Sequence, residues 1–403
     1  MNIRLIYIFL NKIINNCLFQ VLFFNFVQII IWIIYLIKRR IKMTFGIPKE
    51  LSLYTGIPEY RVAISPMGVR ELTSLNAKVY IENGAGEGAN FPDIEYEKNG
   101  ATIVFSKEEV YKRADIVVKV QAPQPEEYKY IKEEQILTGF LHLITAPKDF
   151  IKTLIDKKIT AIGYELIKNE SGRYPIVQPM SDIAGKLSVQ IAGRLLESAS
   201  GGRGILLGGI PGIPSAEVVI LGAGILGQAA ARSFSNIGAN VYVLDLHRKK
   251  FEEIIQHFEH PITTLFASNY NIEKVVKFAD VIIGAVSVPG QKTPILITKE
   301  MIKSMKKGAV IMDFSINQGG CVETSKISPT GKFIYIVDDV IHFCMPNTPT
   351  LVARTTTHVL TGSLIPYFRH LIKEGLENTL TNYPEIQQGI YIDKGKMVKE
   401  YLY

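Results

Sequence analysis

The chain has 403 residues, of which 47% are hydrophobic and 21% are charged. This balance excludes a disordered or fibrous protein, and the length is enough for two ordinary domains. The formal net charge is +7, but residues 1–42 carry six of these charges and no acidic residue, so residues 43–403 are left at +1. A body so close to neutral lacks the basic surface of a nucleic-acid-binding protein.

The three cysteines show no metal-type spacing and are too few for a disulfide framework, so we expect no metal site and a reducing compartment.

The apolar N-terminal extension, residues 1–42, has two interpretations. Residues 13–37 contain no charged residue, and a bilayer-spanning helix needs about 20 apolar residues. The basic residues that follow would keep the body on the cytoplasmic side of such an anchor. The composition also fits upstream sequence translated ahead of a true start at Met43, where a first β-strand can begin. We favour this mis-assigned start, and both interpretations predict a cytoplasmic body.

From residue 43 onward, short β-rich apolar runs alternate with amphipathic helical stretches. The first series predicts strands at 79–81, 116–120, 136–141 and 160–163, and helices at 68–75, 107–113 and 150–157. A longer helix is expected over 182–198, with Ser181 as its N-cap. A glycine-rich stretch, 201–214, then breaks the chain. The alternation predicts a parallel sheet covered by helices.

A second alternating series begins at residue 217. It predicts strands at 218–221, 241–244, 263–266, 281–285, 309–314 and 333–337, and helices at 227–237, 271–278 and 299–305. The last long amphipathic segment, 358–374, lies beyond this series. We expect it to pack back on the first domain.

The strongest local motif is a glycine pattern that follows the expected strand 218–221 and opens a helix. Gly222 permits a tight turn, Gly224 lets the backbone approach a pyrophosphate, and Gly227 lets helix and strand pack closely. The pyrophosphate would lie at the helix N-terminus. Asp245, at the end of the next strand, can accept hydrogen bonds from ribose hydroxyls and would repel a 2′-phosphate. The pattern therefore predicts NAD rather than NADP, although three basic residues, 247–249, leave the strictness of that preference open.

Eight further short motifs follow one another in a fixed order. They are Gly-Ile-Pro-Lys-Glu at 46–50, Tyr-Arg-Val-Ala at 60–63, Glu-Asn-Gly-Ala-Gly at 82–86, Val-Lys-Val at 118–120, Leu-His-Leu at 141–143, Pro-Met-Ser at 179–181, Gly-Gly-Arg-Gly at 201–204 and Gln-Gly-Gly-Cys at 318–321. Together they resemble the alanine dehydrogenase family, which is related to the N-terminal part of proton-translocating transhydrogenase. The resemblance covers essentially all of residues 43–375.

The resemblance implies an α/β fold class, with two Rossmann-like, doubly wound parallel-sheet domains and a cleft between them. Residues 43–175 would form the first part of the substrate and catalytic domain, and 176–353 the NAD-binding domain. Residues 354–403 would supply a C-terminal helix and tail that complete the catalytic domain. The family resemblance also implies a homo-oligomer.

The resemblance further implies site residues. Arg61 would bind the substrate carboxylate, Lys119 would contact the carboxylate or the carbonyl oxygen, and His142 would transfer protons. Ser181, Ser287, Asn317 and Asn347 would border the cofactor. The chemistry suits these residue types, because Arg and Lys bind carboxylates and histidine titrates near neutral pH. The implied reaction is the reversible oxidation of L-alanine by NAD to pyruvate and ammonium.

One position departs from the family pattern, which has Asp immediately before Gln-Gly-Gly. Asn317 occupies it here, and an amide keeps the shape but carries no charge. One alternative is therefore a catalytically weakened or silent NAD-binding homologue. A second alternative, a transhydrogenase-like nucleotide-binding subunit, is disfavoured by His142, which that relative lacks. The sequence does not choose between alanine and another small 2-amino acid.

Overall fold

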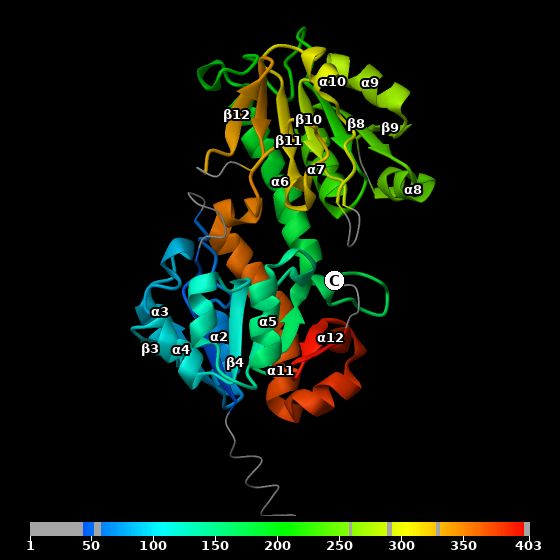
Figure 1. Ribbon diagram of the computed structural model, residues 1–403. Coiled ribbons are helices and arrows are strands. Elements are labelled where there is room, and N and C mark those ends of the chain that lie inside the picture. Colours follow the sequence, from blue (N-terminus) through cyan, green and yellow to red (C-terminus); the bar gives the residue numbers. More distant parts are fainter. Residues whose placement is uncertain (1–42, 52–57, 258–259, 288–291, 328–330, 399–403) are drawn as a thin grey trace, which may run out of the picture.

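The computed structural model describes residues 43–51, 58–257, 260–287, 292–327 and 331–398. The two interpretations of the extension, a mis-assigned start and a membrane anchor, fall on residues 1–42 and lie outside the described residues. Figure 1 shows two lobes, one formed by the blue, cyan and red parts of the chain and the other by its green and yellow parts. No helix within the described ranges is both long and apolar enough to cross a membrane.

The first lobe is built on a sheet with the strand order β15-β14-β6-β5-β4-β1-β2-β3. Its strands are β1 (Thr44–Ile47), β2 (Lys78–Glu82), β3 (Thr102–Val104), β4 (Ile116–Gln121), β5 (Ile136–Phe140), β6 (Thr160–Gly163), β14 (Ile390–Asp393) and β15 (Lys396–Met397). Strands β1 to β6 pair in parallel, whereas β14 and β15 add antiparallel at one edge. Every residue of β4, β5 and β6 is buried, as expected for parallel strands with both faces covered.

Within the described residues, four α-helices connect the parallel strands of this first sheet. They are α2 (Pro66–Ser74), α3 (Asp93–Lys98), α4 (Lys107–Arg113) and α5 (Lys148–Asp156). Ser65 caps α2 and Ser106 caps α4, each with its side chain accepting a backbone N–H of the first turn. Short 3-10 turns follow β5 and β6, and they carry polar side chains at the carboxyl edge of the sheet.

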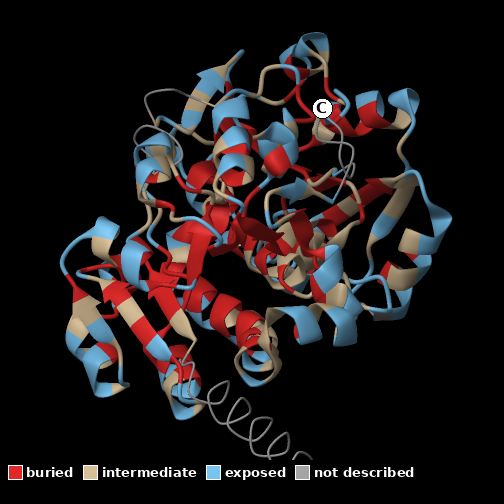
Figure 2. Ribbon diagram, turned by 60° about the horizontal axis from the view of Figure 1, so that its bottom comes forward, coloured by how far each residue is buried: buried red, intermediate tan, exposed pale blue. Residues whose placement is uncertain are grey.

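The second lobe is built on a sheet with the order β12-β13-β11-β10-β7-β8-β9. Its strands are β7 (Glu217–Leu221), β8 (Asn240–Asp245), β9 (Thr263–Phe266), β10 (Val281–Gly284), β11 (Val310–Asp313), β12 (Ile334–Val337) and β13 (Val340–Phe343), and its helices are α7 (Ile225–Asn236), α8 (Arg248–His257), α9 (Asn269–Phe278) and α10 (Lys299–Lys303). Only β12 runs antiparallel among these described strands. The predicted alternation of strands and helices in two mostly parallel sheets is thus confirmed, and Figure 2 shows the buried residues concentrated in their strands.

Helix α6 (Val177–Leu196) joins the two lobes. The prediction that Ser181 caps this helix is wrong: the helix begins at Val177, and Ser181 lies in its second turn. Pro179 explains the error, because proline is tolerated in the first turn, where the N–H groups have no intrahelical acceptor. The helix packs tightly on α7, since a Cβ on Gly185 would lie 2.7 Å from the Cβ of Ala229.

The chain returns to the first lobe through α11 (Ala353–Asn382), followed by α12 (Pro384–Gln388). Leu360, Leu364 and Phe368 of α11 are buried in the same apolar core as Phe45 of β1. The rings of Phe45 and Phe368 meet edge to face with centroids 5.4 Å apart. The regular helical backbone of α11 is interrupted at Gly375, where φ is 77°, and the kink turns the chain toward β14.

Candidate active site

Polar side chains gather where the parallel strands of the first sheet end. Strands β1, β4, β5 and β6 are neighbours in the sheet, so the segments that follow them meet at one edge. Glu50 follows β1, Gln121 ends β4, His142 follows β5, and Glu165 follows β6. Open α/β sheets bind ligands outside the carboxyl ends of their strands. This edge is therefore the candidate substrate site.

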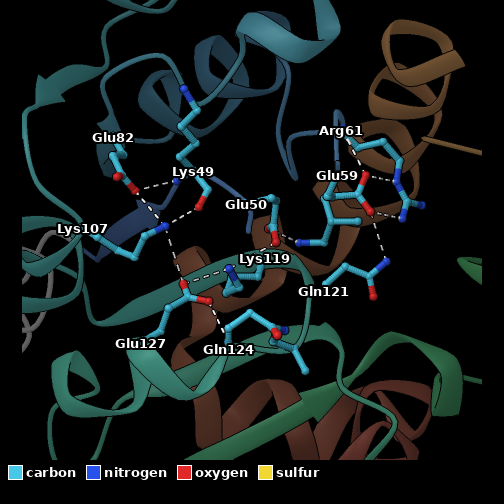
Figure 3. Close-up of polar contacts among 12 residues, drawn as sticks. Lys49, Glu50, Glu59, Arg61, Glu82, Lys107, Lys119, Gln121, Gln124 and Glu127 are labelled. Carbon is cyan, nitrogen blue, oxygen red and sulfur yellow. Dashed lines mark hydrogen bonds and ion pairs between the residues drawn. The ribbon is translucent and has the colours of Figure 1, made fainter. Parts of the chain in front are cut away.

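Arg61 is buried at this edge and is held by Glu59 in a two-pronged ion pair (Figure 3). Its Nε donates to Glu59 Oε1 at 2.7 Å, and its Nη2 donates to Glu59 Oε2 at 2.6 Å. The Nη1 group faces the sulfur of Met180 in α6 at 4.0 Å. Of the five N–H groups of a guanidinium, two have no partner among the described residues. These two are available to an incoming carboxylate.

Glu59 fixes the orientation of Arg61 and is itself fixed from two directions. The hydroxyl of Thr350 donates to its Oε1 at 2.9 Å, and Gln121 Nε2 donates to its Oε2 at 3.2 Å. Burial raises the pKa of Glu59, but the Arg61 charge and the hydrogen bonds from Arg61 and Thr350 outweigh it, so this pKa lies below its ordinary value. The carboxylate therefore stays charged, and Arg61 is held firmly.

Lys119 lies in a separate buried cluster of charges beside this pair (Figure 3). Its ammonium is 3.1 Å from Glu50 Oε2 and 3.1 Å from Glu127 Oε1, and all three side chains are almost fully buried. Lys107 adds a second cation, 3.7 Å from Glu127 Oε1. Burial lowers the pKa of Lys119, but the two carboxylates outweigh it and raise that pKa. The ammonium is thus permanently charged and already paired.

Gln121 is two residues beyond Lys119, at the end of β4, and sequence reasoning missed it. Its amide nitrogen is bonded to Glu59, which fixes the orientation of the amide. Its Oε1 is buried and has no hydrogen-bond partner among the described residues. A buried acceptor that lacks a hydrogen bond costs free energy. The Gln121 Oε1 is therefore suited to accept a hydrogen bond from a bound molecule.

His142 occupies a left-handed backbone conformation, with φ 45° and ψ 45°, two residues after the end of β5. Its side chain is 58% exposed, and its ring is stacked on Phe140 with centroids 6.2 Å apart. Glu165 Oε1 accepts the His142 backbone N–H at 2.6 Å and lies 3.9 Å from the ring Nδ1. An accessible imidazole beside a carboxylate can exchange protons with a bound substrate.

The glycine motif forms the turn between β7 and α7. Gly222 has φ +100°, which favours glycine, and a Cβ on Gly227 would lie 1.9 Å from the Gly222 carbonyl oxygen. Around Gly224, at the start of α7, nothing lies within 4 Å of the position that a Cβ would take. Asp245 Oδ2 accepts the Ala223 N–H at 2.7 Å and so holds this turn from the end of β8. The turn leaves room for an anion at the helix N-terminus.

Asn317 and Ser287 lie at the same edge of the second sheet, after the neighbouring strands β11 and β10, and both are exposed. Ser315 ties the two segments together, because its hydroxyl donates to the Val286 carbonyl at 2.8 Å and accepts the Val286 N–H at 3.1 Å. The buried Asp313 carboxylate accepts backbone N–H groups at both ends of the Asn317 turn, from Ser315 at 3.0 Å and Cys321 at 2.9 Å. The turn is therefore rigidly placed.

The remaining expected cofactor residues lie on the two connections between the lobes. Ser181 is on α6, next to Met180, which contacts Arg61. Asn347 has φ 53° and precedes the turn that carries Thr350, the partner of Glu59. Both connections thus touch the Arg61 pair. Across the part of the chain that the structure describes, no group of three or more His, Cys, Asp or Glu side chains could hold a metal ion.

Comparison with known proteins identifies the family. The model of the alanine dehydrogenase/PNT N-terminal domain matches residues 46–184, and that of the C-terminal domain matches residues 188–400. The chain belongs to this family. The alanine dehydrogenase/PNT resemblance predicted from the sequence motifs is thereby confirmed.

Individual members of the alanine dehydrogenase/PNT family match along almost their whole length. An alanine dehydrogenase of Methanococcus maripaludis is 40% identical over 359 residues, which are 89% of this chain and 95% of that protein. One from Mycobacterium tuberculosis is 38% identical over 358 residues, again 89% and 95% of the two chains. A solved L-alanine dehydrogenase superposes with a TM-score of 0.83 at 37% identity and covers 89% of this chain and 98% of its own. This superposition confirms two Rossmann-like α/β domains.

A transhydrogenase from Sinorhizobium meliloti shares this family fold. It superposes with a TM-score of 0.75 at 22% identity, over 89% of this chain and 99% of its own.

Proposed function

We propose that this protein is an NAD-dependent alanine dehydrogenase. The reaction converts L-alanine, NAD⁺ and water to pyruvate, ammonium, NADH and a proton, and it is reversible. The observation that carries the proposal is the buried Arg61, which Glu59 orients at the carboxyl edge of the first sheet and which keeps two N–H donors for a carboxylate. The similarity to alanine dehydrogenases over nine-tenths of the chain supports it. We further propose a cytoplasmic homo-oligomer.

The turn between β7 and α7 fits a dinucleotide. The open space at Gly224 and the start of α7 suit a pyrophosphate, because the first N–H groups of a helix favour an anion. Each oxygen of Asp245 accepts one backbone N–H, from Ala223 or from His247. A carboxylate has about four acceptor sites, so two remain for ribose hydroxyls, as NAD requires. When bound, NAD accepts the hydride that alanine loses.

The protein's own groups have distinct roles in this proposal. Arg61 clamps the substrate carboxylate, and His142 takes and returns protons as water adds and ammonium leaves. Ser181, Ser287 and Asn347 border the cofactor. The ammonium of Lys119 fixes Glu50 and Glu127 through its two ion pairs. Gln121 has a free amide oxygen that can accept from the amino group of the substrate.

In this proposal the neutral side chain of Asn317 limits kcat for alanine. It is exposed on a turn that Asp313 and Ser315 hold rigidly, and a neutral amide there cannot balance positive charge that develops nearby. Restoring a carboxylate with Asn317→Asp should raise kcat for alanine by about tenfold or more, since charge-assisted hydrogen bonds are roughly twice as strong as neutral ones. Apparent NADH affinity should change little.

The test follows NADH at 340 nm in the purified protein with pyruvate and ammonium, beside Asn317→Asp and Arg61→Met. Oxidation that requires both pyruvate and ammonium and disappears in Arg61→Met supports the proposal. If the unmodified protein binds NADH without turnover and Asn317→Asp restores it, the protein is an NAD-binding homologue that has lost the alanine chemistry. Parallel assays with glycine, serine and 2-aminobutyrate, in the oxidative direction, identify the preferred small amino acid.

A further inference from the structure

The backbone of His142 needs external support. Its left-handed conformation, with φ 45°, is one that L-residues rarely adopt, and it begins a 3-10 turn (Leu143–Thr145) without any side-chain cap. Within the turn, the Thr145 N–H donates to the His142 carbonyl at 2.9 Å. The His142 N–H points the other way and is accepted by Glu165 Oε1 at 2.6 Å. Glu165 therefore fixes the residue from outside its own turn.

Glu165 directs its charge toward His142. It lies in the 3-10 turn that follows β6 (Tyr164–Leu166), and its Oε1 accepts two hydrogen bonds, from the His142 N–H and from the hydroxyl of Tyr391 at 2.8 Å. Its Oε2 is buried and has no hydrogen-bond partner among the described residues. The carboxylate is thus held in one orientation by His142 on one side and Tyr391 on the other.

Tyr391 comes from the far end of the chain, 226 residues after Glu165. It lies in β14, which pairs antiparallel with β6, and the register shifts between Ile390 and Ile392. Such a bulge redirects the side chain at its centre. The Tyr391 ring lies over Gly163, where a Cβ would be only 2.4 Å away. The bulge in β14 and the lack of a side chain at Gly163 together allow the buried phenol of Tyr391 to reach Glu165.

We propose that Glu165 and Tyr391 are positioning residues for His142, and that β14 thereby completes the active site. The inference rests on the proposed role of His142. Glu165 holds the His142 backbone through the N–H and provides the negative charge that faces the ring. Tyr391 prevents the carboxylate from rotating away. Neither residue contacts the substrate in this arrangement.

The experiment compares Glu165→Gln, Glu165→Ala and Tyr391→Phe with the unmodified full chain. Tyr367→Phe is the matched control, because Tyr367 also donates to a glutamate, Glu385 at 3.3 Å, in the same C-terminal part of the protein. The first readout is kcat and KM for alanine. We expect kcat to fall about 10- to 100-fold in Glu165→Gln and about three- to tenfold in Tyr391→Phe, with KM within about twofold in both because Arg61 is untouched.

The second readout does not depend on turnover. Amide hydrogen exchange at residue 142, measured by peptide mass spectrometry, should accelerate at least about tenfold in Glu165→Ala, which removes the acceptor. It should stay slow in Glu165→Gln, whose amide oxygen can still accept the His142 N–H, and this contrast separates the hydrogen bond from the charge.

The outcomes are distinct for the inference and for the proposed function. If the unmodified protein has no alanine activity, the proposed function fails, and unchanged exchange in Glu165→Ala would then also overturn the positioning of His142. If the protein is active and Glu165→Gln and Tyr391→Phe match Tyr367→Phe in kcat, the inference is overturned and the function stands. If Glu165→Ala does not fold, the two conservative variants decide through kcat.

Discussion

Replacing Lys119 by methionine tests whether its ammonium serves the fold or the substrate. The change keeps the apolar stem and removes the charge that lies 3.1 Å from both Glu50 and Glu127. Two buried carboxylates would then face each other without their shared cation, and only the more distant Lys107, 3.7 Å from Glu127 Oε1, would remain beside them. Breaking a buried ion pair in this way costs about 3–5 kcal/mol.

The loss of folding free energy in Lys119→Met follows from the least costly way to relieve the repulsion, which is protonation of one of the two carboxylates. Burial and the neighbouring Glu127 already raise the pKa of Glu50 above its ordinary value of 4.5. Neutralising a group of that ordinary pKa costs about 1.4 kcal/mol for each pH unit above it. The deficit is therefore about 3 kcal/mol at pH 7 and under about 1 kcal/mol at pH 5. Because the folded variant binds more protons than the unfolded chain, its stability falls as pH rises above 4.5.

Urea denaturation followed by circular dichroism, at pH 5 and pH 7, measures this deficit. Lys132→Met is the control, because Lys132 forms an exposed pair with Asp115 at 3.9 Å and such pairs contribute at most about 1 kcal/mol. Adding Glu50→Gln to Lys119→Met should recover part of the loss. An unfolding midpoint equal to that of the unmodified protein at pH 7, with alanine turnover abolished, would refute the structural role and assign the ammonium to the substrate.

Two further predictions concern the cofactor turn and Glu59. Gly227→Ala places a Cβ 1.9 Å from the Gly222 carbonyl and should lower both stability, by about 1–3 kcal/mol, and NADH affinity. At Gly224 nothing lies within 4 Å of the position that a Cβ would take, so Gly224→Ala should keep the melting temperature of the unmodified protein and weaken only NADH binding, measured by fluorescence titration. Equal melting temperatures for Gly227→Ala and Gly224→Ala would contradict this prediction. The pKa of Glu59 is lowered in the folded protein, so its carboxylate contributes stability that is present above pH 4.5 and is lost as pH falls below it. Glu59→Gln should therefore flatten the acid side of the profile of melting temperature against pH. If the profiles of the variant and the unmodified protein ran parallel, this stabilising role of the Glu59 carboxylate would be disproved.

The sequence predicted those features whose signal is local. The glycine pattern after an apolar strand was sufficient to predict the β7–α7 turn, and the strand at 160–163 and the helix at 107–113 occur with the predicted bounds. Helix α8, strand β13 and strand β14 were not predicted. Strand β14 is only four residues long and is stabilised by pairing with β6, a contact between distant parts of the chain that no local pattern reveals.

The partners of the site residues were beyond sequence reasoning for the same reason. Arg61 and His142 were named from short motifs, whereas Glu59, Glu165 and Tyr391 are defined only by contacts in the folded chain. A Glu two residues before Arg61 was visible in the sequence and could have been suspected as its partner. The expected cleft between the domains stays a prediction, as do the roles assigned to the site residues.

The two connections between the lobes have a mechanical consequence. A body joined to another at one point can swing in any direction, but a second joint restricts it to rotation about the line through both. Helix α6 and the segment before α11 are two such joints, and Arg61 touches the first through Met180 and the second through Glu59 and Thr350. Arg61 therefore lies near the axis of any hinge rotation, where displacement is smallest. A ligand anchored at Arg61 would therefore be displaced little by such a rotation.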